Sequence, residues 1–269
     1  FNSLNLAFTL ISSGGFLPVN DFSNIIKDNT QTVVVALLML ISFFSIFFIY
    51  NLILFKNRDK NFFYEDYNLL LYVIVLVLIF LLFFGYNNDF INIIFSIFSS
   101  ISNIGISLNN EINNLQFIFL LLVIIGGSFF STSSGLRFIK IYSLIKFSLN
   151  QILSFSKPRN IFMNRLLFSK TNFEINEINK YFLSIIIFII SLLVLTSLVA
   201  LSGIDFERCL KISILTLMNT VNSSSYGIND FDFQNINFLT KYSLIMFMIV
   251  GRIELLTLLL IIKKYLFKN

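Results

Sequence analysis

Residues 125–140 read IGGSFFSTSSGLRFIK and interrupt what would otherwise be one continuous membrane helix. Three glycines and five hydroxyl side chains fall within residues 125–135, directly after the apolar run FIFLLLVI. Because hydrocarbon offers no hydrogen bonds, such backbone is tolerated at membrane depth only where it lines a water-filled cavity or is buried in protein. The stretch therefore predicts an unwound segment inside a membrane protein.

The composition supports a membrane protein. The 269 residues are 57% hydrophobic and only 12% charged, about half the charge of a soluble domain. Four runs of 22 to 25 residues contain no Asp, Glu, Lys or Arg, and a helix needs roughly 20 residues to cross the hydrocarbon core. These runs are residues 32–55, 67–88, 112–136 and 181–204. We expect an all-α polytopic membrane protein.

The basic residues indicate the topology. A fifth apolar run, 242–262, is uncharged except for Arg252 and Glu254. Fourteen of the nineteen basic residues then form three groups on alternate sides of five spans, so all three share one face. The groups are Lys56, Arg58 and Lys60; Arg137, Lys140, Lys146, Lys157, Arg159, Arg165, Lys170 and Lys180; and Lys263, Lys264 and Lys268. The positive-inside rule predicts that this face, with the C-terminus, is cytoplasmic.

The outer segments predict re-entrant loops. Residues 89–108 and 205–229 each begin with Asp, continue as a short apolar or amphipathic stretch, and end in small polar residues and glycine. Residues 1–18 look like the end of a third copy. A helix of 10–14 residues is too short to span a bilayer but long enough to dip into it. Interfacial helices with solvated loops are the alternative, which three corresponding copies disfavour.

Each copy ends in residues suited to binding a dehydrated cation. Backbone carbonyls at the C-terminal end of a short helix replace the hydration shell of the ion, and glycine permits the positive φ that turns them toward one axis. The candidates are Ser12, Ser13, Gly14 and Gly15; Ser102, Asn103, Ile104 and Gly105; and Asn222, Ser223, Ser224 and Ser225. The third set fits less well because its glycine, Gly227, comes late.

Three motifs resemble the Trk/Ktr/HKT superfamily of potassium transporters. GRIELLTLLLI (251–261) looks like the family's Gly-Arg-(Leu/Ile)-Glu motif in the last helix. IGGSFFSTSSGLRFIKI (125–141) is similar to its IGG…GSTxGGxKxxR segment, and ISSGGF (11–16) resembles its second-repeat filter. The order and spacing match over the whole chain, which corresponds to about the C-terminal three-fifths of the family.

The resemblance implies four helix–pore loop–helix repeats around one pore, usually in a homodimer. Residues 1–66 would end the second repeat, 67–179 would form the third with its broken second helix and basic cytoplasmic segment, and 180–269 the fourth. We expect the missing repeats to be truncated from this sequence or encoded separately. The family's third filter usually reads Thr-Thr-Thr-Gly and its fourth usually carries Gly near Ser225, so these departures leave strict preference for K⁺ over Na⁺ open.

The charged residues of the last span have two interpretations. Arg252 lies near the middle of that span, and Glu254 projects roughly 200° around the helix from it, so each needs a partner elsewhere. A buried Arg–Glu network that locks helices together is one interpretation. In the other, Arg252 faces the pore and holds the broken segment as a gate, a role that the resemblance also implies. The candidate gate residues are Gly126, Gly127, Ser131, Thr132, Ser133, Ser134, Gly135, Arg252 and Glu254.

Partners follow from the same observations. The bilayer is one partner, and the basic stretch 137–180 either anchors a cytoplasmic loop or docks a regulatory ring. The resemblance implies that this ring is a separate, nucleotide-binding cytosolic protein. The sequence offers no nucleotide-binding motif or metal-ligand cluster, so we expect no enzyme activity, no cofactor in this chain and no nucleic-acid partner.

These observations predict the membrane subunit of a bacterial inner-membrane potassium uptake system, passing K⁺ through filter carbonyls. A Na⁺-permeable or weakly selective relative is one alternative. A non-conducting subunit, or a hydrophobic subunit of a respiratory complex, is another. The respiratory alternative fits less well, because proton-moving subunits need charged residues midway along several helices.

Overall fold

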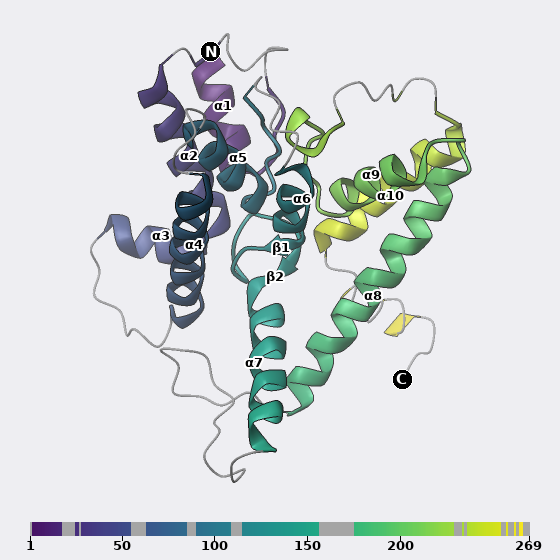
Figure 1. Ribbon diagram of the computed structural model, residues 1–269. Helices are drawn as coiled ribbons and strands as arrows, with labels where there is room; N and C mark the ends of the chain where they lie inside the picture. The colour runs from purple at the N-terminus through teal and green to yellow at the C-terminus, as the bar shows by residue number, and fades with distance from the viewer. Residues whose placement is uncertain are drawn as a thin grey trace.

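The computed structural model describes residues 2–17, 25, 26, 28–54, 63–84, 90–108, 115–155, 175–228, 233, 236–253, 257, 261, 264 and 265. Helices dominate this part of the chain, as the apolar runs predict (Figure 1). They are α1 (Asn2–Ile11), α2 (Asn29–Phe43), α3 (Ile46–Ile53), α4 (Tyr64–Phe84), α5 (Phe90–Ile101), α6 (Gln116–Ile124), α7 (Phe138–Ser154), α8 (Ile175–Ala200), α9 (Phe206–Leu217), the 3₁₀ turn η5 (Ser224–Tyr226) and α10 (Phe238–Ile253).

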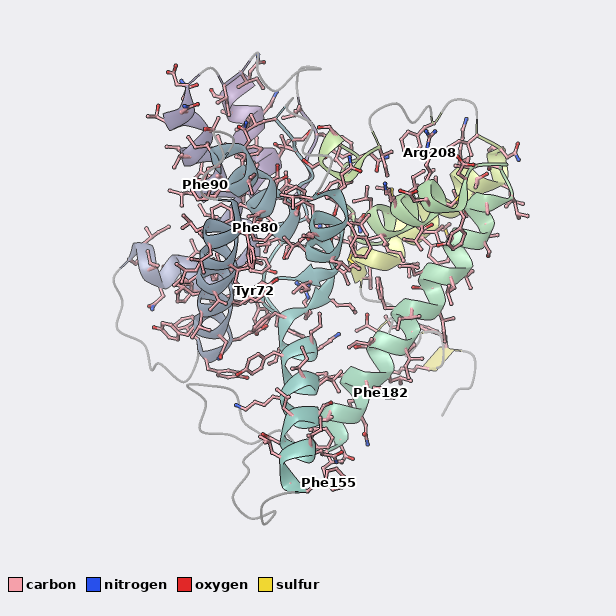
Figure 2. All side chains as sticks on the ribbon, in the orientation of Figure 1. Tyr72, Phe80, Phe90, Phe155, Phe182 and Arg208 are labelled. Atoms are coloured by element: carbon pink, nitrogen blue, oxygen red, sulfur yellow. The ribbon has the colours of Figure 1, made fainter. Side chains whose placement is uncertain are left out.

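Two helices have the length and composition to cross a bilayer unbroken. Within the described residues these are Tyr64–Phe83, with a mean hydropathy of 2.5, and Ile175–Ala200, with 2.9. At about 1.5 Å per residue they extend about 30 and 39 Å. Only a third of each apolar window is buried inside the protein, so most of these side chains face outward. Phe182 on α8, which is 58% exposed, is an example (Figure 2).

The helices of the three predicted re-entrant segments are too short to span. α1 has 10 residues, and α5 and α9 have 12 each, so they extend about 15–18 Å. They occupy the three segments where the sequence predicts re-entrant helices. In each case the helix is followed by irregular backbone and does not continue as a helix.

The predicted span 32–55 is not one helix. α2 ends at Phe43, and Phe44 and Ser45 are extended, with ψ of 163° and 141°, before α3 begins. The Ser45 hydroxyl caps α3 by accepting a hydrogen bond from the Phe48 amide. An apolar run indicates that a segment lies in the membrane, but it does not indicate whether the segment is one continuous helix. The composition therefore did not predict this break.

The predicted interruption of the span 112–136 is present. α6 ends at Ile124, and the short strands β1 (Ile125–Gly126) and β2 (Leu136–Arg137) pair in parallel on either side of a closed loop. Because the two strands are parallel, the chain leaves the loop in the same direction in which it entered. α7 therefore continues below α6 (Figure 1). We call residues 126–135 the intramembrane loop.

The helices form two groups joined by the α6–loop–α7 column (Figure 1). α2 packs on α5 in one group, and α9 packs between α8 and α10 in the other. α7 and α8 contact each other and form a V that opens toward α9 and α10. Gly251 lets α10 approach the end of α9, because a Cβ there would lie 2.1 Å from the Leu217 carbonyl oxygen. This approach brings the end of α10 to the loops described below.

The buried face of α8 gives a direct test of the fold. Leu195 is fully buried, whereas Leu193 on the same helix is 57% exposed. Lipid is as apolar as a protein core, so Leu195→Ala loses mainly packing and leaves a cavity. We expect Leu195→Ala to lower the free energy of unfolding by about 2 kcal/mol. Leu193→Ala is the matched control, and thermal unfolding of the purified protein in detergent is the measurement. Equal effects of the two variants would contradict this orientation of α8.

Candidate ion pathway

Three loops share one backbone conformation after a short helix. Ser13, Asn103 and Asn219 have φ of 51°, 60° and 52°, and each lies two residues after the end of α1, α5 or α9. We call residues 12–16 loop A, 102–106 loop B and 218–222 loop C. Two residues further along, Gly15 and Gly105 also have positive φ, at 70° and 81°, whereas loop C has Val221 at the equivalent position.

The three loops pack backbone against backbone, in the order A, B, C. A Cβ on Gly15 would lie 1.9 Å from the Ile104 carbonyl oxygen of loop B, and a Cβ on Gly105 would lie 2.3 Å from the Val221 carbonyl oxygen of loop C. Only glycine permits approaches this close at positive φ. The arrangement gathers carbonyl groups of three loops in one region of the protein.

The left-handed residues fix each loop to the element next to it. Ser13 Oγ donates to the Thr132 carbonyl of the intramembrane loop at 2.8 Å. Asn103 Nδ2 donates to the Met218 carbonyl of loop C at 3.2 Å, and Asn219 Nδ2 donates to the Met248 carbonyl of α10 at 3.0 Å. These side chains therefore have positioning roles between successive elements.

Two of the three predicted ion-binding sets lie wholly in loops A and B, and the third lies only partly in loop C. Ser12–Gly15 and Ser102–Gly105 fall in loops A and B. Of the third predicted set, only Asn222 falls in loop C. Ser223 precedes η5, and Ser224 and Ser225 lie within it; there Ser224 Oγ donates to Ser107 Oγ at 2.7 Å. Tyr226, fully buried, donates from its hydroxyl to Ser100 Oγ at 3.1 Å.

The loop C equivalents of Asn103, Ile104 and Gly105 are Asn219, Thr220 and Val221, three residues before the predicted stretch. The predicted stretch 222–225 lies nearer to the late glycine at position 227. The sequence also contains a second signal, which indicates the earlier residues. Asn103 and Asn219 each lie fourteen residues after the Asp of an Asp-Phe pair, at positions 89–90 and 205–206.

A cavity of about 970 Å³ lies between loops A and C and α10. Its polar lining includes Ser12, Ser13, Asn219, Thr220 and Arg252. The four predicted residues of loop B are buried and do not line it. Loops A and C therefore face this cavity from two sides.

The intramembrane loop fits into the break between α2 and α3. The Ser128 and Ser133 amides donate to the Phe43 and Ser42 carbonyls, each at 3.1 Å. In return, the Ile46 amide donates to the Phe130 carbonyl at 3.3 Å. Each interruption therefore satisfies backbone groups that the other leaves without helical partners.

Arg252 joins the intramembrane loop to loop A. One guanidinium nitrogen donates to Ser134 Oγ at 2.9 Å and to Ser13 Oγ at 3.3 Å, and the other donates to the Ser12 carbonyl at 3.1 Å. Glu254, the second charged residue of this span, lies outside the described residues. Arg252 thus contacts both the predicted gate segment and one of the predicted filter segments.

The remaining predicted gate residues form the loop itself. Thr132 Oγ1 donates to the Ile11 carbonyl at the end of α1 at 2.8 Å. Gly126 belongs to β1, the Gly127 amide donates to Ser133 Oγ at 3.0 Å, and Gly135 precedes β2 with φ of 95°. Ser131 Oγ lies 3.0 Å from Ser133 Oγ. The hydroxyl groups therefore replace part of the hydrogen bonding of the interrupted helix.

Sequence reasoning missed Arg137 as a site residue. Its guanidinium donates to the Ser128 carbonyl at 3.0 Å, to Ser131 Oγ at 3.1 Å and to the Ser133 carbonyl at 3.2 Å. Counting Arg137 among the cytoplasmic basic residues concealed this role. Its position directly after the glycine-rich stretch was the available signal. Arg137 closes the intramembrane loop on itself, whereas Arg252 ties it to loop A.

Known structures share this architecture. The chain superposes on the crystal structure of the potassium transporter TrkH from Vibrio parahaemolyticus with a TM-score of 0.77 and 18% sequence identity. The match covers 97% of this chain and 57% of that one, so this chain spans less than two thirds of its length. No family model and no curated protein sequence matches significantly. The likeness shows a Trk-like fold and confirms the expected all-α polytopic membrane class.

The contact between loops B and C can be tested at Gly105. Gly105→Ala places a methyl group against the Val221 carbonyl, whereas a Cβ added to Gly203, also at positive φ (76°), would have nothing within 4 Å. Both variants carry the cost of left-handed backbone, about 1–2 kcal/mol, and only Gly105→Ala adds overpacking of about 1–3 kcal/mol. We expect the larger loss of thermal stability for Gly105→Ala in detergent. Equal losses would contradict the close packing of loops B and C.

Proposed function

We propose that this chain is the pore-forming membrane subunit of a potassium uptake system. The observation that carries the proposal is the packing of loops A, B and C. Three short helices end in the same left-handed turn, and the loop backbones that follow lie side by side. Arrays of backbone carbonyls are the means by which proteins replace the hydration shell of K⁺. The match to a protein titled a potassium transporter supports the choice of ion.

The proposed ion-binding groups are backbone carbonyls of the three loops. In loops A and B they belong to residues 12–15 and 102–105. In loop C we propose residues 219–222 in place of 222–225, because 219–221 repeat the position of 103–105 relative to the preceding helix. The helix C-termini add partial negative charge near these carbonyls, which favours a cation.

The intramembrane loop is the proposed gate, and Arg252 is its latch. The loop lies against loop A, to which Thr132 and Arg252 connect it. Holding it there requires the guanidinium contact to Ser134, and moving it away requires that contact to break. Hydrogen bonds to a charged group each contribute about 1.5–3 kcal/mol, which is enough to bias a gate strongly toward one position.

The remaining assignments belong to the same proposal. The protein works in the bacterial inner membrane as a homodimer, with its C-terminus in the cytoplasm. A separate nucleotide-binding ring docks on the cytoplasmic basic segment, four of whose eight Lys and Arg residues lie outside the described part of the chain.

A weakly selective or Na⁺-permeable pore is the second candidate. The observation that favours it is Val221, which stands where loops A and B have Gly15 and Gly105. φ is positive at both glycines but not at Val221, so the carbonyls of loop C follow a different path. A filter with one unlike side offers a less uniform carbonyl cage, and discrimination between ions of similar size depends on that cage.

Growth complementation tests the proposed function. The gene encoding this chain, expressed with its whole reading frame, should restore growth of a bacterium that lacks potassium uptake on medium with about 0.1–1 mM K⁺, a concentration range in which many transporters half-saturate. Uptake of ⁸⁶Rb⁺ with and without excess Na⁺ then separates the two candidates. Absence of growth despite membrane expression would contradict both of them.

Arg252→Ala tests the latch. Removing the guanidinium frees Ser134 and loop A, so we expect ⁸⁶Rb⁺ flux in proteoliposomes to rise by about tenfold or more, since each lost charged hydrogen bond is worth that factor. Arg252→Lys should have an intermediate effect, because an ammonium reaches fewer of the three acceptors. Lys264→Ala is the charge-matched control. Wild-type flux in Arg252→Ala would contradict the latch.

A further inference from the structure

Two adjacent carboxylates at the start of α4 contact both interrupted helices. Glu65 and Asp66 lie in the first turn of α4, close to where the Tyr67 ring packs against Phe48 of α3. Neither residue has a part in the pore and gate described above. Asp66 is 4% exposed, so its side chain needs polar partners inside the protein.

Asp66 stabilises the break between α2 and α3. One carboxylate oxygen accepts from the Ser45 amide at 2.9 Å, and the other accepts from the Ser45 hydroxyl at 2.6 Å. The same hydroxyl accepts from the Phe48 amide at 3.1 Å and so caps α3. With Ser45 held this way, the Ser42 and Phe43 carbonyls at the end of α2 remain available to the intramembrane loop.

Glu65 binds the tip of the intramembrane loop itself. Its Oε1 accepts from the Phe129 amide at 3.0 Å. Next to this contact, the Ile46 amide donates to the Phe130 carbonyl, and the rings of Phe47 and Phe130 pack edge to face at 5.3 Å. The loop is therefore held at Ser134 by Arg252 and at Phe129 by Glu65, two points five residues apart.

Space for movement lies beside the Glu65 contact. A pocket of about 450 Å³ is lined by both carboxylates, by Phe129 and Phe130 of the loop, and by Lys140 and Tyr181 of α7 and α8. Phe129 and Phe130 are 53% and 55% exposed, so the surroundings of the tip are only partly filled. Once the Phe129 amide is released, the tip has room to shift without displacing the core.

Charge at the helix terminus does not by itself account for this geometry. Any acidic residue in the first turn of α4 would interact favourably with the helix dipole. Here each carboxylate also binds a backbone amide of a different interrupted segment, Ser45 in one case and Phe129 in the other. Both contacts join residues far apart in the chain.

We propose that Glu65 and Asp66 form a clasp that sets the resting position of the intramembrane loop from the end opposite the Arg252 contact. Asp66 holds the α2–α3 break in shape, and Glu65 fixes the loop tip against it. Release of Glu65 lets the tip move into the adjacent pocket. Glu65 is thus a positioning residue, and its effect on ion flow rests on the proposed gate function.

Three substitutions distinguish the effect of the side-chain length of Glu65 from the effect of its charge. Glu65→Ala removes the acceptor, Glu65→Asp keeps the charge but shortens the side chain, and Glu65→Gln loses the charge but keeps an acceptor oxygen at the same reach. Hydrogen exchange of the peptide covering residues 126–135, measured on the whole protein in lipid nanodiscs, reports the loop directly. We expect exchange about tenfold faster in Glu65→Ala and Glu65→Asp, and within about threefold of wild type in Glu65→Gln.

Flux measurements on the same variants distinguish the clasp from the gate. Glu207→Ala, which removes an exposed carboxylate paired with Lys211 on α9, is the control and should leave loop exchange unchanged. Unchanged exchange in both Glu65→Ala and Glu65→Asp would overturn the clasp, as would equal acceleration in Glu65→Gln. Faster exchange with raised ⁸⁶Rb⁺ flux supports clasp and gate together. Faster exchange with wild-type flux supports the clasp and contradicts the gate.

Discussion

Every backbone amide and carbonyl inside a bilayer needs a partner within the protein, and this structure depends on how that requirement is met at two interrupted helices. The break between α2 and α3 exposes the Ser42 and Phe43 carbonyls, and the intramembrane loop supplies amides to both. Each interrupted segment donates hydrogen bonds to carbonyls of the other, so each interruption stabilises the other. Arg137 satisfies carbonyls that remain inside the loop. Unwound backbone is thereby stabilised at membrane depth without becoming a continuous helix.

The same requirement shapes loops A, B and C. Their backbones pack so closely that side chains are excluded at Gly15 and Gly105, and polar side chains at Ser13, Asn103 and Asn219 fix each loop to the next element. Loop A also receives Arg252 from α10, near the opposite end of the chain. The loops and the intramembrane loop thus form one hydrogen-bonded unit. Ser13 and Arg252 connect the intramembrane loop directly to loop A.

Patterns that depend on local composition were informative. Long uncharged runs predicted the membrane class, short apolar segments predicted α1, α5 and α9, and the glycines and hydroxyls of residues 125–135 predicted the interruption of α6. Features that depend on contacts between distant residues could not be predicted in this way. Residues 32–55 contain no charged side chain and no glycine or proline, so nothing in them indicated that Asp66 would bind Ser45 and end α2 early. Gly227 follows η5, and the predicted stretch 222–225 extends beyond the loop C residues that repeat the position of 103–105.

The sequence by itself determined which segments enter the membrane, which helices are too short to cross it, and where one helix must unwind. It could do so because hydrophobicity, segment length and glycine content act locally along the chain. Only the tertiary structure decided that Arg252 contacts Ser134 and Ser12, that Arg137 closes the loop, and that Glu65 and Asp66 hold two breaks together. Those contacts join residues separated by up to 240 positions in the chain, and no local pattern encodes which buried charge meets which freed carbonyl or amide.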